Sequence, residues 1–133
     1  MTKRYYVAVF GEPGLLGGKP PFADGRYPVG SGRWPAGIRP GDVVMVYCTA
    51  KFPGYPKKSP GFGIIYRVDT PAKTIYYRFL KFTTPMAIDD LRRLFSPGDK
   101  SLFDKIRFKN FWLSEITEAS FLNVVVVKAV AWV

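Results

Sequence analysis

Histidine does not occur in this sequence of 133 residues, and cysteine occurs once, as Cys48. Without histidine, the chain has no Ser-His or Cys-His catalytic pair and lacks the commonest metal ligand. A single cysteine excludes an intrachain disulfide and a cysteine-cluster zinc site. The remaining side chains form no credible pair of general base and nucleophile. We therefore expect a protein that is not an enzyme and that uses no metal or other cofactor.

Long apolar runs are also missing from the sequence. No segment approaches the roughly 18 apolar residues that a membrane-spanning helix needs, and the four valines at 124–127 are followed by Lys128. The N-terminus shows no apolar stretch followed by a small-residue cleavage site, so no signal peptide is visible. We expect a cytoplasmic protein that does not contact a membrane.

Acidic residues are scarce: 10 Asp and Glu stand against 20 Lys and Arg, which gives a net charge of +10. Residues 1–81 hold 13 basic and 4 acidic side chains, whereas residues 82–133 hold 7 and 6. A positive field concentrated in one part of the chain attracts polyanions such as nucleic acid. No basic amphipathic helix accompanies the charge, so an anionic membrane is a weaker match.

The length and composition indicate one domain spanning residues 1–133. Hydrophobic residues make up 47% of the chain and aromatic residues 17%, which is enough for a core and excludes general disorder. Apolar, β-branched runs bounded by glycine and proline predict strands at residues 5–10, 43–48, 62–68 and 74–82. The segments between them, 11–40 and 51–61, are rich in turn formers and are expected to be long loops.

The last third of the chain favours short helices. Ile88, Leu91 and Phe95 recur at helical spacing after Pro85, and a helical turn is expected at 102–106. A short strand is expected at 111–113, then a brief helix capped at 117–118, and a closing strand at 123–133. The sum is an α+β, mostly β fold, a pseudo-barrel of about five to six strands with short peripheral helices.

Aromatic residues alternate with glycines and basic residues on the predicted loops. Nucleic-acid bases stack well on aromatic rings, at about 1–3 kcal/mol each, and Lys and Arg neutralise phosphates. The candidate stacking residues are Tyr27, Tyr55 and Phe62, and the candidate phosphate contacts are Lys19, Arg26, Lys51, Lys57 and Lys58. For Tyr47 and Phe62 taken singly, packing in the core is the stronger interpretation. For Trp34, ligand contact is slightly favoured.

Four segments occur in an order that resembles a known family. They are Tyr5–Phe10, Gly32-Arg33-Trp34 with Ile38–Tyr47, Gly61–Val68, and Tyr77–Phe79 with Pro85–Leu91. The second segment contains Gly41-Asp42 before an apolar strand that ends at Tyr47. In these segments and their order, the sequence is similar to the EVE domains of the PUA-like superfamily, relatives of the YTH readers of methylated bases.

The resemblance implies a PUA-like pseudo-barrel that holds one extruded, modified base, such as a methylated cytosine or adenine, in an aromatic pocket. The implied pocket residues are Phe10, Gly11, Ser31, Gly32, Arg33, Trp34, Tyr47, Cys48 and Thr49. In prokaryotes, such domains often recognise DNA for modification-dependent restriction systems. The resemblance therefore favours DNA over RNA as the partner, with fused or associated NTPase or nuclease subunits.

Two other functions stay open. One is an RNA-binding accessory module of PUA-like or ASCH-like type, and the other is a small nucleoside-processing enzyme. The enzyme needs a general acid or base in its cleft, for which the loops offer only Glu12, Asp24, Lys19 and Lys51. A titration of methylated and unmodified duplexes against single-stranded RNA separates the two binding functions, and a product assay on nucleosides tests the enzyme.

Overall fold

The computed structural model describes residues 3–11, 21–29, 34–50, 52, 54–105 and 112–131. Within these residues, the strands are β1 (Tyr5–Phe10), β2 (Arg26–Pro28), β3 (Val43–Cys48), β4 (Lys58–Asp69), β5 (Thr74–Ala87) and β6 (Trp112–Ile116). A 3-10 helix at Pro21–Asp24 precedes β2. The α-helices are α1 (Ile88–Leu94), α2 (Pro97–Lys100), α3 (Leu102–Lys105) and α4 (Glu118–Ala131).

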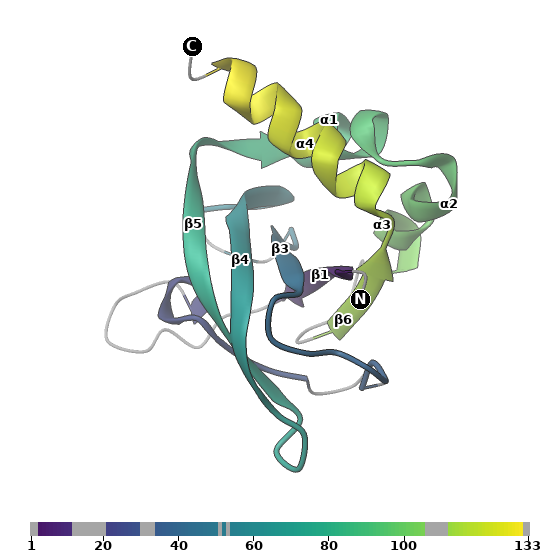
Figure 1. Cartoon of the computed structure of the whole chain (residues 1–133). Coiled ribbons are helices and arrows are strands. Elements are labelled where there is room, and N and C mark those ends of the chain that lie inside the picture. Colours follow the sequence, from purple (N-terminus) through teal and green to yellow (C-terminus); the bar gives the residue numbers. More distant parts are fainter. Residues whose placement is uncertain are drawn as a thin grey trace.

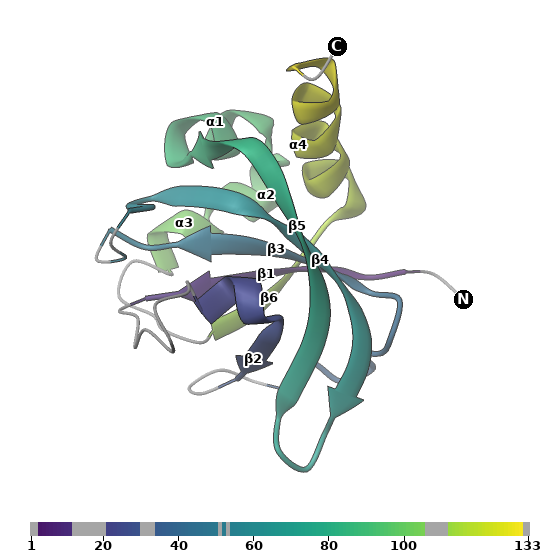
Figure 2. The same ribbon diagram turned by 90° about the vertical axis from the view of Figure 1, so that its left-hand side faces the viewer.

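The strands form one curled sheet in the order β2-β5-β4-β3-β1-β6. Strands β1 and β3 run parallel, and every other neighbouring pair is antiparallel. Figure 1 shows α4 crossing one end of β4 and β5, and Figure 2 shows α1, α2 and α3 on the same side of the sheet as α4. This architecture confirms the predicted α+β pseudo-barrel.

Side chains on the two faces of the sheet form two apolar clusters. Along β3, Val44, Val46 and Cys48 point into the interior cluster inside the barrel. The alternate residues Met45 and Tyr47 belong to the outer cluster, together with residues of the helices. All of β3 is buried, as its continuous apolar sequence predicts.

Tyr27 joins the two edge strands of this sheet. Its hydroxyl, on β2, lies 2.7 Å from the carbonyl oxygen of Val9 in β1 and 2.9 Å from that of Trp112 in β6. No backbone ladder joins β2 to β6 in the described part of the chain, so this side chain bridges the barrel where pairing stops. Burial raises the pKa of the Tyr27 hydroxyl well above its usual value, which keeps it a donor. The expected stacking role of Tyr27 is therefore corrected: its ring is fully buried in the core.

The C-terminal segment differs from its sequence prediction, because residues 118–131 form α4 and not a closing strand. Valine favours strands, yet Phe121 and Val124, three positions apart, both pack into the outer cluster. This packing on one helix face overrides the local preference. The predicted cap is confirmed, since the Thr117 hydroxyl accepts a hydrogen bond from the Ser120 amide at 3.3 Å. In the described chain no helix, α4 included, combines the length and apolar content needed to cross a membrane.

The observed bounds of other elements also differ from the predicted ones. The predicted loop 11–40 contains a 3-10 helix and β2, and β4 begins four residues before Phe62, at Lys58. Pro85 lies inside β5, and the helix begins only at Ile88. The pairing of β5 with β4 is irregular between Lys81 and Met86, so Pro85 occupies a stretch where the missing amide breaks no regular ladder.

The bridge predicts a specific loss in a Tyr27→Phe variant. Removing the hydroxyl leaves buried carbonyl oxygens with one donor fewer, so we expect the free energy of unfolding to fall by about 1–3 kcal/mol. Urea titration monitored by circular dichroism measures this change. The matched control is Tyr66→Phe, because that ring is 54% exposed. Equal stability of the two variants would contradict the role of the bridge.

Candidate functional site

A small pocket opens at the C-terminal end of β3. It is lined by Tyr47, Thr49, Ala50, Lys57, Ile88, Arg92 and Phe103, and its volume is about 80 Å³. Tyr47, Thr49 and Lys57 are residues that the sequence analysis assigned to nucleic-acid contact. Because β3, the loop after it, α1 and α3 all contribute, the pocket exists only in the folded domain.

Backbone hydrogen bonds of Thr49 shape the wall of this pocket. Its amide donates to the carbonyl oxygen of Phe10 at 2.9 Å, and its carbonyl accepts from the amides of Phe52 at 3.1 Å and Lys57 at 3.3 Å. The amide of Ile88 donates to the Lys57 carbonyl at 2.9 Å, which ties the start of α1 to the loop. Lys57 has a φ of 54°, a left-handed conformation that this network holds in place.

The aromatic rings of Tyr47 and Phe103 form the floor of the pocket. Their ring centroids lie 5.5 Å apart with an edge-to-face angle of 69°. Burial raises the pKa of Tyr47 to about 12, although the Arg92 charge acts in the opposite direction. At neutral pH the Tyr47 hydroxyl is therefore uncharged. This packing agrees with the interpretation of Tyr47 as a core residue whose side chain also reaches the pocket surface.

Lys57 and Arg92 give the pocket its charge. Both side chains are exposed, and none of the described residues that line the pocket is acidic. Arg92 lies 3.6 Å from Asp104, and both side chains are well exposed, so the pair holds Arg92 only weakly. Sequence reasoning missed Arg92. Its spacing could have revealed it, because Ile88 and Arg92 are four residues apart and therefore share one face of α1.

The residues predicted to line the base pocket lie on opposite faces of the sheet. Phe10 and Cys48 are buried in the interior cluster, whereas Tyr47 faces the outer cluster. The expectation that Tyr47 and Cys48 line one pocket is thus corrected, since neighbouring strand residues point to opposite faces. Gly11 is also buried. Burial raises the pKa of the Cys48 thiol, so it stays protonated and unreactive.

The other predicted aromatic contacts pack against neighbouring rings. Trp34 and Tyr55 are half-buried against the interior cluster, and the Tyr55 ring centroid lies 5.3 Å from that of Phe22. Phe62 lies 5.2 Å from Phe121 of α4, edge to face. The stacking role of Phe62 is therefore corrected: it anchors α4 to the sheet.

The predicted phosphate contacts lie in different places. Lys57 is at the pocket, Arg26 is exposed on β2, and Lys58 is half-buried at the start of β4. Five predicted residues lie outside the described residues, namely Lys19, Ser31, Gly32, Arg33 and Lys51.

The Gly41-Asp42 pair has a structural role at the opposite end of β3. Buried Asp42 accepts hydrogen bonds from the amides of Arg4 at 3.0 Å and Arg39 at 3.1 Å. Gly41 has a φ of 97°, which favours glycine, and its amide donates to the carbonyl of Ile65 at 2.8 Å. The pair therefore fixes the turn that leads into β3.

A second polar cluster, formed by Asp99, Thr117 and Ser120, is a helix cap. The Asp99 carboxylate accepts from the Thr117 amide at 3.0 Å, from the Thr117 hydroxyl at 2.8 Å and from the Ser120 hydroxyl. These bonds satisfy the N-terminus of α4. Over the described ranges, no group of three or more His, Cys, Asp or Glu residues is placed to hold a metal ion.

Comparison with known proteins bears on the fold. No protein-family model matches the sequence, and no curated protein matches it. The crystal structure of protein Atu2648 from Agrobacterium tumefaciens is similar, with a TM-score of 0.61 and 16% identity, over 94% of this chain and 92% of that chain. The NMR structure of Rpa0253 from Rhodopseudomonas palustris gives 0.59 and 15%, over 96% and 94%. At these identities the likeness shows the fold alone, so the resemblance to EVE domains stays a prediction.

The raised pKa of Tyr47 predicts part of the alkaline loss of stability. The folded-state pKa of about 12 exceeds the value of 10.0 for a free tyrosine, so the folded protein holds this proton more tightly than the unfolded chain. Its contribution is complete below pH 10 and is lost as the pH rises towards 12. We expect the free energy of unfolding to fall less steeply in Tyr47→Phe than in the wild type over this interval. A Tyr47→Phe slope equal to that of the wild type would refute the assignment.

Proposed function

We propose that this domain binds nucleic acid without catalysing a reaction, and that the pocket at the end of β3 receives one base. The observation that carries the proposal is the meeting of Tyr47 and Thr49 with Lys57 and Arg92 in one pocket. Aromatic side chains beside two cations suit a nucleobase, which is a planar ring attached through its sugar to phosphates. The net charge of +10 favours a polyanion as the partner.

The size of the pocket suggests how a base would enter. Its volume of about 80 Å³ is smaller than the cavity of about 150 Å³ that holds benzene in another protein, so only an edge of the ring would be enclosed. The sugar and phosphates would then lie at the mouth, beside Lys57 and Arg92. Thr49 and the uncharged Tyr47 hydroxyl offer hydrogen bonds to the polar edge of the base.

The resemblance to EVE domains adds a more specific proposal. The base would be modified, such as a methylated cytosine or adenine in DNA. The domain would act in the cytoplasm as the recognition part of a modification-dependent restriction system, with NTPase or nuclease subunits. The proposal assigns the domain no catalytic step. RNA is the alternative ligand, because the same cations suit its phosphates.

We expect removal of a pocket cation to weaken nucleic-acid binding, and removal of the acidic residue next to Arg92 to strengthen it. Lys57→Gln and Arg92→Gln each remove a phosphate contact, so we expect several-fold weaker binding and a salt slope smaller by about 0.9 on duplex DNA. Asp104→Asn removes the acid that competes for Arg92, so we expect tighter binding. Fluorescence anisotropy measures these affinities on duplexes with and without one methylated base and on single-stranded RNA of the same sequence.

The control for lost charge is Lys3→Gln, because Lys3 precedes β1 at the end of the sheet opposite the pocket. Ala50 is an exposed wall residue, and Ala50→Phe fills the pocket without changing charge. We expect Ala50→Phe to remove the preference for the modified duplex and to keep the salt dependence. Binding that is insensitive to salt, or that Lys3→Gln weakens as much as Lys57→Gln, would overturn the proposal.

A further inference from the structure

Two tyrosines and two arginines are in contact on the outer face of the β4–β5 hairpin. The ring centroids of Tyr66 and Tyr76 lie 6.4 Å apart. The guanidinium carbon of Arg67 lies 4.8 Å from the Tyr76 centroid, and that of Arg78 lies 5.6 Å from the Tyr66 centroid. These four residues, Tyr66, Arg67, Tyr76 and Arg78, are called the hairpin ladder below.

A β-bulge builds this arrangement. Strand β4 has one extra residue relative to β5 between Ile65 and Arg67. Ile65 and Val68 both pack against the interior cluster although they are three positions apart, which regular alternation does not allow. The bulge therefore turns both Tyr66 and Arg67 outward, where unbroken alternation would direct Arg67 towards the core.

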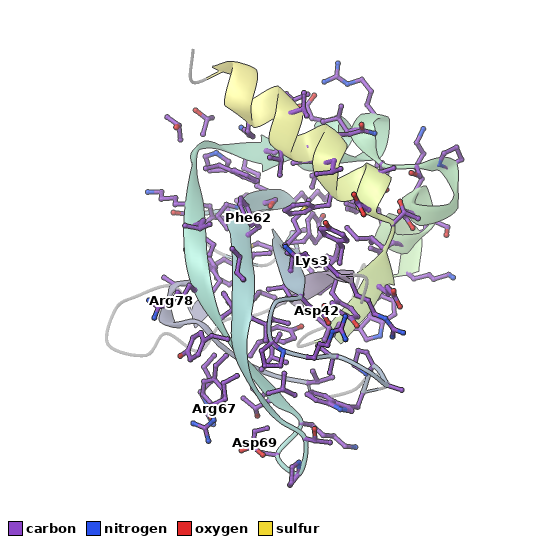
Figure 3. All side chains as sticks on the ribbon, viewed as in Figure 1. Lys3, Asp42, Phe62, Arg67, Asp69 and Arg78 are labelled. Carbon is purple, nitrogen blue, oxygen red and sulfur yellow. The ribbon has the colours of Figure 1, made fainter. Side chains whose placement is uncertain are left out.

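Three residues of the hairpin ladder, Tyr66, Arg67 and Arg78, are exposed, and Tyr76 is half-buried. Tyr66 is 54% exposed, and its apolar neighbours Ile64 and Leu80 are also exposed. Figure 3 shows Arg67 and Arg78 pointing away from the helices, whereas Phe62, earlier on β4, lies beneath α4. Exposed aromatic and apolar side chains on one face of a sheet are typical of an interaction site.

The charge on this face is positive. Arg26 of β2 is exposed and is paired with Tyr76 in the sheet, so the two residues lie on the same face. Asp69, at the end of β4, is the one acidic residue in β2, β4 and β5. Among the residues that the structure describes, no carboxylate forms an ion pair with Arg67 or Arg78.

We propose that the hairpin ladder binds a single-stranded nucleic acid. Bases stack on Tyr66 and Tyr76, and phosphates lie against the arginines, Arg26 included. Aromatic rings flanked by cations bind single strands with little sequence preference, and guanidinium planes also stack on bases. A duplex keeps its base faces covered, so it offers this surface only phosphates. The ladder shares no residue with the pocket at the end of β3, so this proposal does not depend on that one.

Anisotropy titrations of the full chain test the proposal. The probes are labelled oligothymidylate and oligouridylate of about 12 nucleotides and a duplex of the same length. We expect both single strands to bind more tightly than the duplex. Tyr66→Leu keeps apolar area but loses the aromatic face, so affinity for single strands should fall about 5- to 150-fold. Tyr66→Phe keeps the ring and should retain affinity.

The arginines have their own readout and control. Arg67→Gln with Arg78→Gln should reduce the salt slope for a single strand by about 1.4, because two phosphate contacts are lost. Lys100→Gln on α2 removes one exposed charge elsewhere and should change the affinity little. Thermal melting verifies that each variant is folded. The modified-duplex preference lost in Ala50→Phe and the strand affinity lost in Tyr66→Leu are measured separately, so that failure of one proposal is distinguishable from failure of the other.

Several outcomes would overturn the proposal. One is wild-type affinity in folded Tyr66→Leu, and another is equal or tighter binding of the duplex. A third is a wild-type dimer that Tyr66→Leu converts to a monomer in sedimentation while strand binding is unchanged, which would assign this face to a second copy of the chain. Unequal affinity for the two single strands supports the proposal and shows that the surface senses the sugar 2′-hydroxyl or the thymine methyl group.

Discussion

The hydrogen bonds of the Tyr27 hydroxyl are the constraint on which the barrel depends. They connect β2 with β1 and β6, and β2 and β6 are the edge strands that no backbone ladder joins in the described residues. This bridge keeps the sheet curled around its interior cluster, and the curl in turn leaves an outer face on which the helices pack. The pocket at the end of β3 uses α1 and α3, so its shape follows from the same curvature.

The two faces of the sheet differ in what they contact. The interior cluster holds Phe10 and Cys48 and forms the core, whereas both proposed binding surfaces lie outside it. On the outer face, the helices cover one part and contribute to the pocket. The β4–β5 hairpin extends beyond them, with Tyr66, Arg67 and Arg78 exposed. Both candidate surfaces combine aromatic rings with cations, which is the chemistry that a net charge of +10 leads one to expect.

Composition and local pattern predicted much of the fold, because apolar β-branched runs and their turns specify strands directly. The C-terminal helix was missed because consecutive valines favour a strand, and only the spacing of Phe121 and Val124 against the sheet reveals the helix. The structure brings the predicted contact residues Tyr47, Thr49 and Lys57 together in one pocket, and Arg92 joins them only through tertiary folding. Because side chains alternate between the two faces of a strand, the sequence alone predicts that adjacent Tyr47 and Cys48 point to opposite faces. The bulge beside Tyr66 has no sequence signature.

The position of β1 has a consequence for how the chain reaches its native state. Tyr5 pairs on one side with Val43 and on the other with Ile116, so one central strand contacts both the first half and the last part of the chain. Such long-range contacts require closure of large loops before they contribute stability, and they slow folding. During synthesis, β1 stays without its β6 partner until residue 116 has emerged, so a nascent chain exposes one edge of β1 that the folded domain covers.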